Sequence, residues 1–291
     1  MSEPALTRND LLRKTRAILE RHALSPNHDL GQNFCVEPAI LDLVSRTVQE
    51  VNPSTILEVG GGLGTLSEQL VNLHATLTIV EKDPNLAILL ERSFGSSGAT
   101  VANTDVLQVD GEVWASQDVV TGNIPYEISS PLLGVIWKSC NERGRASPHI
   151  IFTVQKEFGQ RLAAPAGTQD YGRLGVMAQL LTTPHLLKVY PPSAFYPVPK
   201  VAHAVVWLEP NPNPRPELRD PNLTPFLTDL FNRKNKKVTS VLRPRYKRRP
   251  DRASVEAALK SSPLSERRVK DLSPNECVDL FLIWREVTTS G

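Results

Sequence analysis

The residues best suited to chemistry lie at positions 121–126, where an amide, a proline and an aromatic ring follow an apolar pair. Val119 and Val120 predict a strand, so this segment leaves the carboxyl end of that strand. The Asn123 side chain both accepts and donates hydrogen bonds, and Tyr126 offers a flat ring for stacking. The pair suits a planar ring that carries an amine, such as a nucleobase. Taken alone, the segment has a second interpretation as a plain strand-end turn, because glycine, asparagine and proline are common turn residues.

Short apolar strands and helices alternate around this segment. Strands are predicted at residues 55–59, 77–80, 100–102, 118–121, 149–154, 186–190 and 204–208. Helices are predicted at residues 38–48, 65–72, 85–92, 130–139, 157–163 and 174–181. The alternation predicts an α/β fold with a doubly wound, Rossmann-like parallel sheet that helices cover on both faces.

Ligands of doubly wound sheets bind beyond the carboxyl ends of the strands, and four such ends carry candidate groups here. These groups are the glycines between Gly60 and Gly64, then Glu81, Asp105 and Asn123. Glu81 lies about twenty residues after the first glycine, where a carboxylate reaches ribose hydroxyls. Asp105 is placed to accept a hydrogen bond from an adenine amine. The four ends together predict a cofactor that contains a nucleoside.

The spacing of the glycines distinguishes between two such cofactors. A dinucleotide fingerprint requires a glycine at position 65, which is Thr65 in this chain. The observed pattern, with glycines at 60, 62 and 64 after Glu58, is more typical of S-adenosylmethionine binding. A nucleotide-dependent oxidoreductase is therefore disfavoured. Glu58 itself is interpreted as a residue that orients the glycine loop or the methionine part of the cofactor.

Composition limits the remaining classes of protein. The 291 residues are 40% hydrophobic and 22% charged, which is ordinary for a globular protein. No apolar run reaches the roughly 18 residues that a membrane span needs, and the N-terminus lacks the apolar stretch of a signal peptide. The scattered Cys35, Cys140 and Cys277 have no metal-ligand spacing, so no metal is predicted. A cytoplasmic protein without a membrane partner is expected.

Positive charge is concentrated near the C-terminus. Nine basic residues follow one another without an acid: Arg233, Lys234, Lys236, Lys237, Arg243, Arg245, Lys247, Arg248 and Arg249. A polyanion such as a nucleic acid is one partner that this run fits, and a solvated helix face is the alternative. The run lies in a helical region, residues 222–291, after a linker at 211–221 that is rich in proline. A methyltransferase-like domain at 1–210, with an N-terminal helix at 6–24, precedes the linker.

Several ordered motifs resemble one known family. They lie at residues 30–34, 58–64, 122–126, 155–157, 171–174, 176–179, 191–200, 204–206 and 231–242. Through them the chain is similar to the rRNA adenine dimethyltransferase family, KsgA type, which modifies small-subunit ribosomal RNA. The resemblance covers nearly all of the chain from about residue 20. It implies a seven-stranded methyltransferase sheet, a small helical C-terminal domain and S-adenosylmethionine as methyl donor.

The resemblance also implies the roles of individual residues. Residues around S-adenosylmethionine are expected to be Gln32, Asn33, Cys35, Gly60, Gly62, Gly64, Glu81, Lys82, Asp105, Val106 and Asn123. Asn123 Oδ1 and the carbonyl of Ile124 are expected to accept from the adenine amine, between the rings of Tyr126 and Phe195. Without the resemblance, Phe195 fits a stiff proline-rich loop between two strands equally well. Arg173 and Lys200 are expected to join the basic run in contacting RNA.

Three departures from the family pattern bear on these expectations. Asn27, His28 and Asp29 stand where a basic residue is usual, and Cys35 and Ile124 replace the more common leucines. The first expectation is a monomeric enzyme that forms dimethyladenine in small-subunit rRNA and assists subunit maturation. The second is a 23S rRNA methyltransferase of the antibiotic-resistance type. The third is an assembly factor with secondary catalysis. For the first, Phe195→Ala is expected to slow methylation while folding stays intact.

Overall fold

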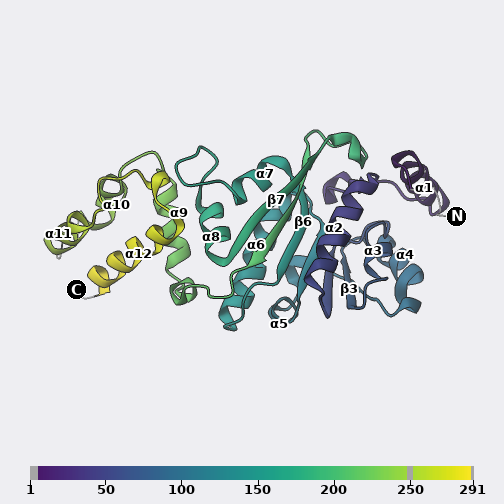
Figure 1. The fold of residues 1–291 in the computed structure, drawn as a ribbon, viewed down its shortest axis with the longest axis horizontal. Coiled ribbons are helices and arrows are strands. Elements are labelled where there is room, and N and C mark those ends of the chain that lie inside the picture. Colours follow the sequence, from purple (N-terminus) through teal and green to yellow (C-terminus); the bar gives the residue numbers. More distant parts are fainter. Residues whose placement is uncertain (1–5, 248–251, 290–291) are drawn as a thin grey trace. The chain divides into compact units, whose positions relative to one another are not determined.

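The computed structural model describes residues 6–247 and 252–289, which fall into two compact units. The first unit comprises Met1–Gly159 and His185–Pro210, and the second comprises Gln160–Pro184 and Asn211–Gly291. A seven-stranded sheet has the strand order β4-β3-β2-β5-β6-β9-β7, and Figure 1 labels β3, β6 and β7 within it. Its strands are β2 (Thr55–Val59), β3 (Thr76–Glu81), β4 (Thr100–Asn103), β5 (Val119–Asn123), β6 (His149–Gln155), β7 (Thr182–Tyr190) and β9 (His203–Pro210).

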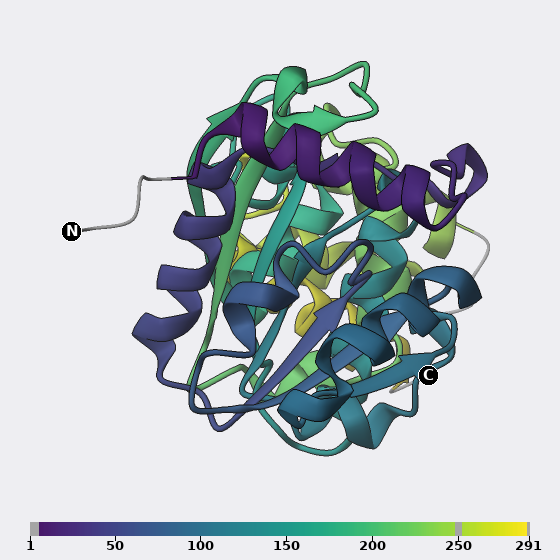
Figure 2. The ribbon, with the colours of Figure 1, turned by 90° about the vertical axis from the view of Figure 1, so that its right-hand side faces the viewer.

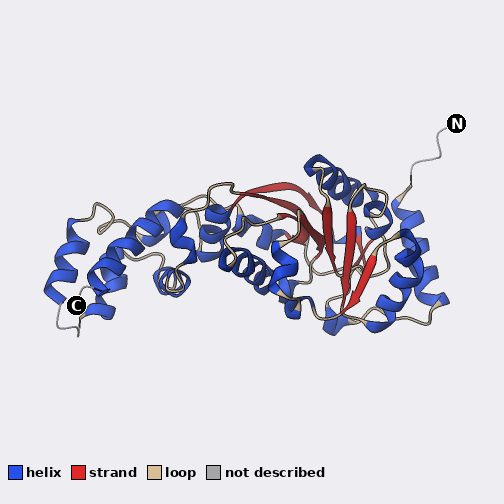
Figure 3. Cartoon of the chain, turned by 90° about the horizontal axis from the view of Figure 1, so that it is seen from below, coloured by secondary structure: helices blue, strands red, loops and turns tan. Residues whose placement is uncertain are grey.

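The five strands from β4 to β6 are parallel, and β9 runs antiparallel to β6. The central strands are rich in apolar residues, as expected where helices pack on both faces of a sheet. Figure 3 shows these helices on either side of the strands. Ile56, Val119, Ile151 and Val205 are each fully buried in one hydrophobic cluster. All seven strands predicted from the sequence are confirmed.

The helices of the first unit are α1 (Arg8–Arg21), α2 (Pro38–Val51), α3 (Ser67–Leu70), α4 (Pro84–Phe94), α5 (Gly111–Ala115) and α6 (Tyr126–Glu142). Side-chain caps mark the N-termini of α1, α2, α4 and α5 among them. Asp83 caps α4 by accepting from the amides of Asn85 and Leu86, and Pro84 occupies the first helical position. This cap starts α4 directly after β3, so the residues between them are held at the strand end.

Short elements account for the main differences from the sequence-based prediction. The helix predicted at 65–72 is only the four residues of α3. A two-stranded ladder of β1 (Phe34–Cys35) and β8 (Phe195–Tyr196), together with α5, was not predicted. Two-residue strands have too few residues to show the alternating pattern on which strand prediction depends. This ladder joins two of the predicted motifs, because Cys35 pairs with Phe195 and Phe34 with Tyr196.

The second unit is helical, with α8 (Arg173–Leu181), α9 (Leu223–Phe231), α10 (Val238–Tyr246), α11 (Arg252–Ser261) and α12 (Pro274–Thr289). The remaining helix, α7 (Lys156–Leu162), begins in the first unit and ends in the second. The predicted domain boundary at residue 210 is wrong for 160–184, because α8 packs against α9 and α12. The predicted linker is also partly ordered, since Arg215 pairs with Glu217 and Asp279. Among the described helices, none combines the length and the hydrophobicity that crossing a bilayer requires.

Candidate active site

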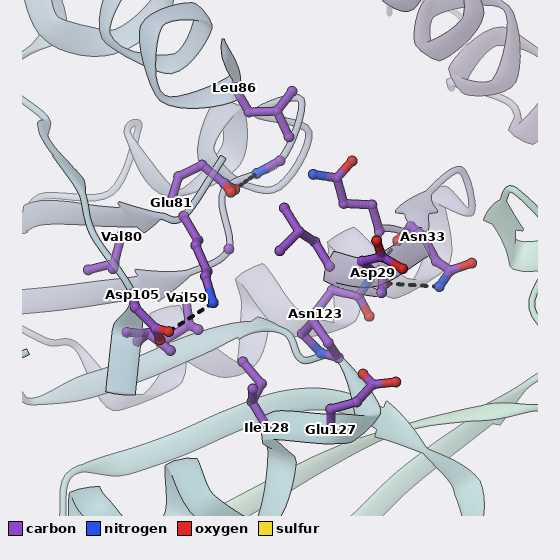
Figure 4. A pocket seen from close by; sticks show the side chains of 18 of the residues that line it. Asp29, Asn33, Val59, Val80, Glu81, Leu86, Asp105, Asn123, Glu127 and Ile128 are labelled. Carbon is purple, nitrogen blue, oxygen red and sulfur yellow. Dashed lines mark hydrogen bonds and ion pairs between the residues drawn. The ribbon is translucent and has the colours of Figure 1, made fainter. Parts of the chain in front are cut away.

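A pocket lies at the carboxyl ends of β2, β3, β4 and β5, where ligands of doubly wound sheets bind. Most of the residues that the sequence predicted to contact the cofactor line this pocket. They are Gln32, Asn33, Gly60, Gly62, Glu81, Lys82, Asp105, Val106 and Asn123. Figure 4 shows Glu81 and Asp105 on one wall and Asn33 and Asn123 on another. The four strand ends that the sequence predicted to act together therefore meet at one cavity.

The glycine loop after β2 forms one side of this pocket. Gly60 has a φ of +71°, which other residues rarely adopt, and a Cβ atom there would meet nothing within 4 Å. That open space is the pocket itself, so the bare backbone of Gly60 lets a ligand approach closely. Gly64 was also predicted to bind the cofactor, but it is not among the lining residues. A Cβ atom at Gly64 would lie 2.5 Å from the ring of Phe94, so this glycine is required for packing.

Glu81 ends β3 with its carboxylate held by the backbone. Its Oε2 accepts from the amide of Gly62 over 2.9 Å, and its Oε1 accepts from the amide of Asp83 over 2.8 Å. Burial raises the pKa of Glu81, although the two amide donors oppose that shift. A carboxylate has about four lone-pair positions, so both oxygens can accept a further hydrogen bond. Glu81 thus fixes the glycine loop and still presents acceptors to the pocket.

Asp105 lies two residues after the end of β4 and pairs with Lys82. Lys82 Nζ lies 2.9 Å from Asp105 Oδ2, and Oδ1 accepts from the amide of Leu107 over 2.9 Å. The hydrogen bond from Lys82 is the main reason that the pKa of Asp105 is lowered. The carboxylate therefore stays charged near neutral pH and is oriented beside Val106, which also lines the pocket.

The segment before β1 closes the opposite side. Gln32 Nε2 donates to Asp83 Oδ2 over 3.0 Å, and Gln32 Oε1 accepts from the amide of Asn27 over 2.8 Å. The nitrogen of this side-chain amide therefore holds the segment against the start of α4, and its oxygen closes the turn between Asn27 and Gln32. Asn33 Nδ2 donates to the carbonyl of Gly31 over 3.0 Å, which stabilises the turn that leads into β1.

Asn123 is the last residue of β5 and meets this segment directly. Its Nδ2 donates to the backbone carbonyl of Asn33 over 2.7 Å. A carbonyl can only accept, so the side-chain nitrogen must face Asn33 and Oδ1 must point away from it. Within the described part of the chain, no group donates to Oδ1 of Asn123. The site therefore presents a fixed and unused acceptor at its edge.

The pocket is rich in acids. Asp29, Glu81, Asp105 and Glu127 line it, and Lys82, which is paired with Asp105, is the only basic residue among its lining residues. Such a lining favours a positively charged ligand. Asp29 and Glu127 were not predicted as site residues. The only signal for them was position, because Asp29 directly precedes one predicted motif and Glu127 directly follows another.

The sequence profile of the ribosomal RNA adenine dimethylase family matches residues 23–285. The chain belongs to this family. A probable ribosomal RNA small subunit methyltransferase A from Thermococcus gammatolerans is 32% identical, over 93% of this chain and 93% of the relative. A ribosomal RNA small subunit methyltransferase A from Alkaliphilus metalliredigens is 30% identical, over 79% of this chain and 81% of the relative.

Two solved structures share the fold of this dimethylase. A dimethyladenosine transferase from Plasmodium falciparum superposes with a TM-score of 0.74 and 22% identity, over 88% of this chain and 98% of that one. The 23S rRNA methyltransferase ErmE superposes with a TM-score of 0.60 and 25% identity, over 86% and 99% of the two chains. The predicted methyltransferase sheet with a helical C-terminal region is therefore confirmed.

The dimethylase is an S-adenosylmethionine-dependent rRNA methyltransferase, and its pocket fits that cofactor. Glu81 and Asp105 suit ribose hydroxyls and an adenine amine, while Val80, Leu86 and Ile128 provide apolar surface. The excess of acids suits the cationic sulfonium. The open space in front of Gly60 admits a ligand close to the backbone.

A second, smaller cavity of about 60 Å³ adjoins the first and is lined by Cys35, Glu58, Thr153 and Asn123. Cys35, predicted as a cofactor contact, lines only this second cavity. Burial raises the pKa of the Cys35 thiol to about 12, so it stays protonated. Glu58 is 1% exposed and accepts from Ser67 Oγ over 2.6 Å. This arrangement ties the end of β2 to α3.

The two predicted stacking rings differ in exposure. Tyr126 is the first residue of α6 and is 63% exposed, so its ring is open to a base. Phe195 is 1% exposed, and its ring centroid lies 4.4 Å from that of His203. The prediction of an open sandwich between them is wrong for this structure, because β8 pairs with β1 and buries Phe195 in the core.

The described residues among the predicted RNA contacts fall into three groups. Arg233, Lys236, Arg243, Lys247 and Lys200 are exposed, and within the described residues none of them has an ion-pair partner. Arg173 is half-buried at the start of α8. Three others have partners within the chain: Lys234 Nζ donates to the carbonyls of Gln169 and Tyr171, Lys237 pairs with Glu266, and Arg245 pairs with Asp229. Arg248 and Arg249 lie outside the described residues.

Proposed function

We propose that this dimethylase transfers two methyl groups to the exocyclic amines of adenines in small-subunit rRNA. The curated relatives named as small subunit methyltransferases support this choice, since the Thermococcus protein aligns over 93% of both chains. The proposal includes a cytoplasmic, monomeric enzyme that acts on free rRNA or on a pre-ribosomal small subunit. Binding to the immature subunit would let the same protein assist maturation.

One observation carries the chemical part of the proposal: the hydrogen bond from Asn123 Nδ2 to the carbonyl of Asn33. It leaves Oδ1 of Asn123 as an acceptor for one hydrogen of the target amine. The backbone carbonyl of Ile124 is the proposed acceptor for the other hydrogen. Ile124 is held in place because its backbone amide donates to the carbonyl of Thr153 over 2.9 Å.

These two acceptors address a specific chemical obstacle. The lone pair of an adenine amine is delocalised into the ring, which makes the nitrogen a poor nucleophile. Two acceptors out of the ring plane favour a pyramidal nitrogen whose lone pair points toward the donor. When bound, S-adenosylmethionine supplies a methyl group on a positively charged sulfur, so no strong base is needed. Positioning of this kind supplies much of the rate enhancement in such reactions.

The remaining residues hold the base. Tyr126 offers its exposed ring, and stacking on an aromatic side chain contributes roughly 1–3 kcal/mol per base. Phe195 supports the site indirectly, because it is buried in the core where β8 pairs with β1. After the first transfer the amine keeps one hydrogen, so one of the two acceptors suffices for the second transfer once the amine has rotated. The exposed Arg233, Lys236 and Arg243 of the second unit are the proposed contacts to RNA phosphates.

The alternative is a 23S rRNA methyltransferase, and the superposition with ErmE favours keeping it as the second candidate. Incubation with S-adenosylmethionine labelled on the methyl group, and with purified small- and large-subunit rRNA in separate reactions, distinguishes the two. Label in small-subunit RNA alone, recovered as dimethyladenine after nuclease digestion, is expected. Label confined to large-subunit RNA would overturn the proposal. Asn123→Ala serves as the matched control, because it removes the proposed acceptor and keeps the other residues that line the cofactor pocket.

A further inference from the structure

The N-terminal helix α1 carries an excess of positive charge. Within Arg8–Arg21 five residues are basic and two, Asp10 and Glu20, are acidic. A capping box between Thr7 and Asp10 fixes the start of the helix. The sequence predicted this helix but assigned it no function, and its charged residues lie outside the site described above.

Apolar contacts hold α1 against the wall of the pocket. Leu19 is buried in a cluster with Phe34 and Leu86, both of which line the pocket. Leu11 is buried in a second cluster with Val36 and Leu41. Because both ends of the helix are anchored, its charged side chains have defined positions relative to the site. Figure 2 shows α1, in dark purple, crossing the first unit beside the green segment that carries β8.

Two arginines of α1 face that segment. Arg8 donates to the backbone carbonyl of Ser193 over 3.3 Å, and the Arg16 guanidinium lies 5.2 Å from the ring centroid of Tyr196. Both arginines are exposed. Tyr196 pairs with Phe34 in the β1–β8 ladder. Asn33 precedes Phe34, and its backbone carbonyl accepts from the side-chain amide of Asn123. A short chain of contacts thus connects Arg16 to the fixed acceptor of the site.

The other basic residues of α1 lie elsewhere on the helix. Lys14 pairs with Glu68 of α3, and Arg13 pairs with Asp10 of the same helix. At about 100° per residue, Arg21 lies roughly 140° around the helix from Arg16. Arg8 and Arg16 therefore form one pair beside β8, and Lys14 and Arg21 form a matched pair on a different side of the same helix.

An RNA strand that delivers an adenine to this pocket meets acids first. Asp29, Glu81, Asp105 and Glu127 line the cavity, and residues 25–33 contain no lysine or arginine. Phosphates next to the target nucleotide are repelled by these acids unless cations lie beside the opening. Arg8 and Arg16 are the cations of α1 that contact the segment next to the site. Arginine binds phosphate with a planar fork of donors and also stacks on aromatic rings.

We propose that Arg8 and Arg16 form a phosphate-binding surface for the RNA strand that carries the target adenine. This surface is distinct from the basic residues of the second unit. The inference rests on the proposed function, because it assumes that the ligand at this pocket is a strand of RNA.

The test compares Arg8→Gln/Arg16→Gln with Lys14→Gln/Arg21→Gln, which removes the same charge from another side of α1. Binding of full-length transcribed small-subunit rRNA is measured by filter retention over a range of salt concentrations. Loss of two phosphate contacts is expected to make the slope of log K against log salt less negative by about 1.4, at about 0.7 per single-strand contact. Affinity is expected to fall about tenfold for this variant and to change less than twofold for the control.

Additional measurements separate a direct contact from a structural role. Cofactor affinity by calorimetry and the melting temperature are expected to stay at wild-type values in both double variants. Arg8→Lys/Arg16→Lys keeps both charges and is expected to restore the salt slope. An unchanged salt slope in the glutamine variant, or an equal loss in the control, would overturn the inference. If the wild-type enzyme binds this RNA but does not methylate it, the proposed function fails, whereas the binding comparison still decides the role of α1.

Discussion

Asn123 and Asn33, ninety positions apart in the chain, share a hydrogen bond of 2.7 Å from Nδ2 to the backbone carbonyl. The bond joins the end of a central strand to the segment that closes the pocket. It decides the orientation of the Asn123 amide, because only the nitrogen can donate to a carbonyl. The orientation of the proposed catalytic acceptor is therefore built into the fold before substrate binds.

Replacing Asn123 by alanine removes this acceptor and is expected to lower the methylation rate at least 1000-fold, since positioning of the amine is lost. Cofactor affinity is expected to fall only modestly, because Glu81, Asp105 and the glycine loop remain. Single-turnover assays with saturating RNA, together with calorimetry, measure both quantities. Asn123→Asp provides a matched variant of the same shape, in which a carboxylate faces the carbonyl of Asn33. A near-normal single-turnover rate in the alanine variant would exclude the proposed role.

Glu81→Gln keeps the size of the side chain and removes its charge. Charged hydrogen bonds contribute about 1.5–3 kcal/mol, so the cofactor dissociation constant is expected to rise about 10- to 100-fold. Calorimetric titration with S-adenosylmethionine measures this change. Glu91→Gln removes a charge from an exposed position of the neighbouring helix α4 and is the control. Equal affinities for wild type and Glu81→Gln would show that ribose binding does not depend on this carboxylate.

Phe195→Ala is expected to destabilise the first unit as well as slow methylation. The ring is buried against His203 and within the main core cluster, and such truncations cost about 3–5 kcal/mol. The sequence alone suggested that Phe195→Ala would fold normally, whereas the burial of this ring predicts a loss of stability. Urea unfolding of Phe195→Ala and Phe195→Leu separates stability from activity. A stable alanine variant with a normal methylation rate would leave Phe195 without either role.

Much of the site was predictable because it depends on the order of strands. Glu81, Asp105 and Asn123 each follow an apolar run, and parallel strands bring their carboxyl ends to one edge of a sheet. The position of Phe195 was not predictable in the same way. Its burial follows from a two-residue ladder with Cys35, and such a ladder leaves no periodic pattern in the sequence.

Pairing of surface charges was equally hidden in the sequence. The basic run predicted nine similar contacts to RNA, yet Lys234 donates to the carbonyls of Gln169 and Tyr171. Those partners lie more than sixty positions away, and backbone carbonyls carry no signal in the sequence. Likewise, Gly64 fits the cofactor pattern by spacing, whereas its actual neighbour is Phe94.

Lys234 and Lys236 therefore make a matched pair for mutation to glutamine. Lys234→Gln is expected to lower the unfolding free energy by about 1–3 kcal/mol, because the carbonyls of the buried Tyr171 and of the exposed Gln169 lose a charged donor. Lys236→Gln is expected to leave stability within about 0.5 kcal/mol of wild type and to make the salt slope of RNA binding less negative by about 0.7. Urea unfolding and filter binding at several salt concentrations measure the two effects. If Lys236→Gln lowered stability and Lys234→Gln changed only the salt slope, Lys234 would not be the structural lysine of the pair and Lys236 would not be the RNA-binding one.

The buried Glu58 makes the free energy of unfolding fall as the pH rises. Burial raises its pKa from 4.5 to about 8, and the carboxyl of Glu81 adds to the shift. Below pH 4.5 both the folded and the unfolded state keep the proton, so the full contribution of Glu58 to stability is present. Between pH 4.5 and 8 only the unfolded state releases the proton, so this contribution is lost at about 1.4 kcal/mol per pH unit.

Glu58→Gln lacks this titration and retains an acceptor for Ser67 Oγ. Relative to wild type, it is expected to gain on the order of 4 kcal/mol in unfolding free energy between pH 5 and pH 9. Urea unfolding of both proteins at the two pH values measures the difference, in which the titration of all other groups cancels. A difference that stays constant between pH 5 and pH 9 would show that Glu58 is ionised in the folded protein and that the cavity beside it is hydrated.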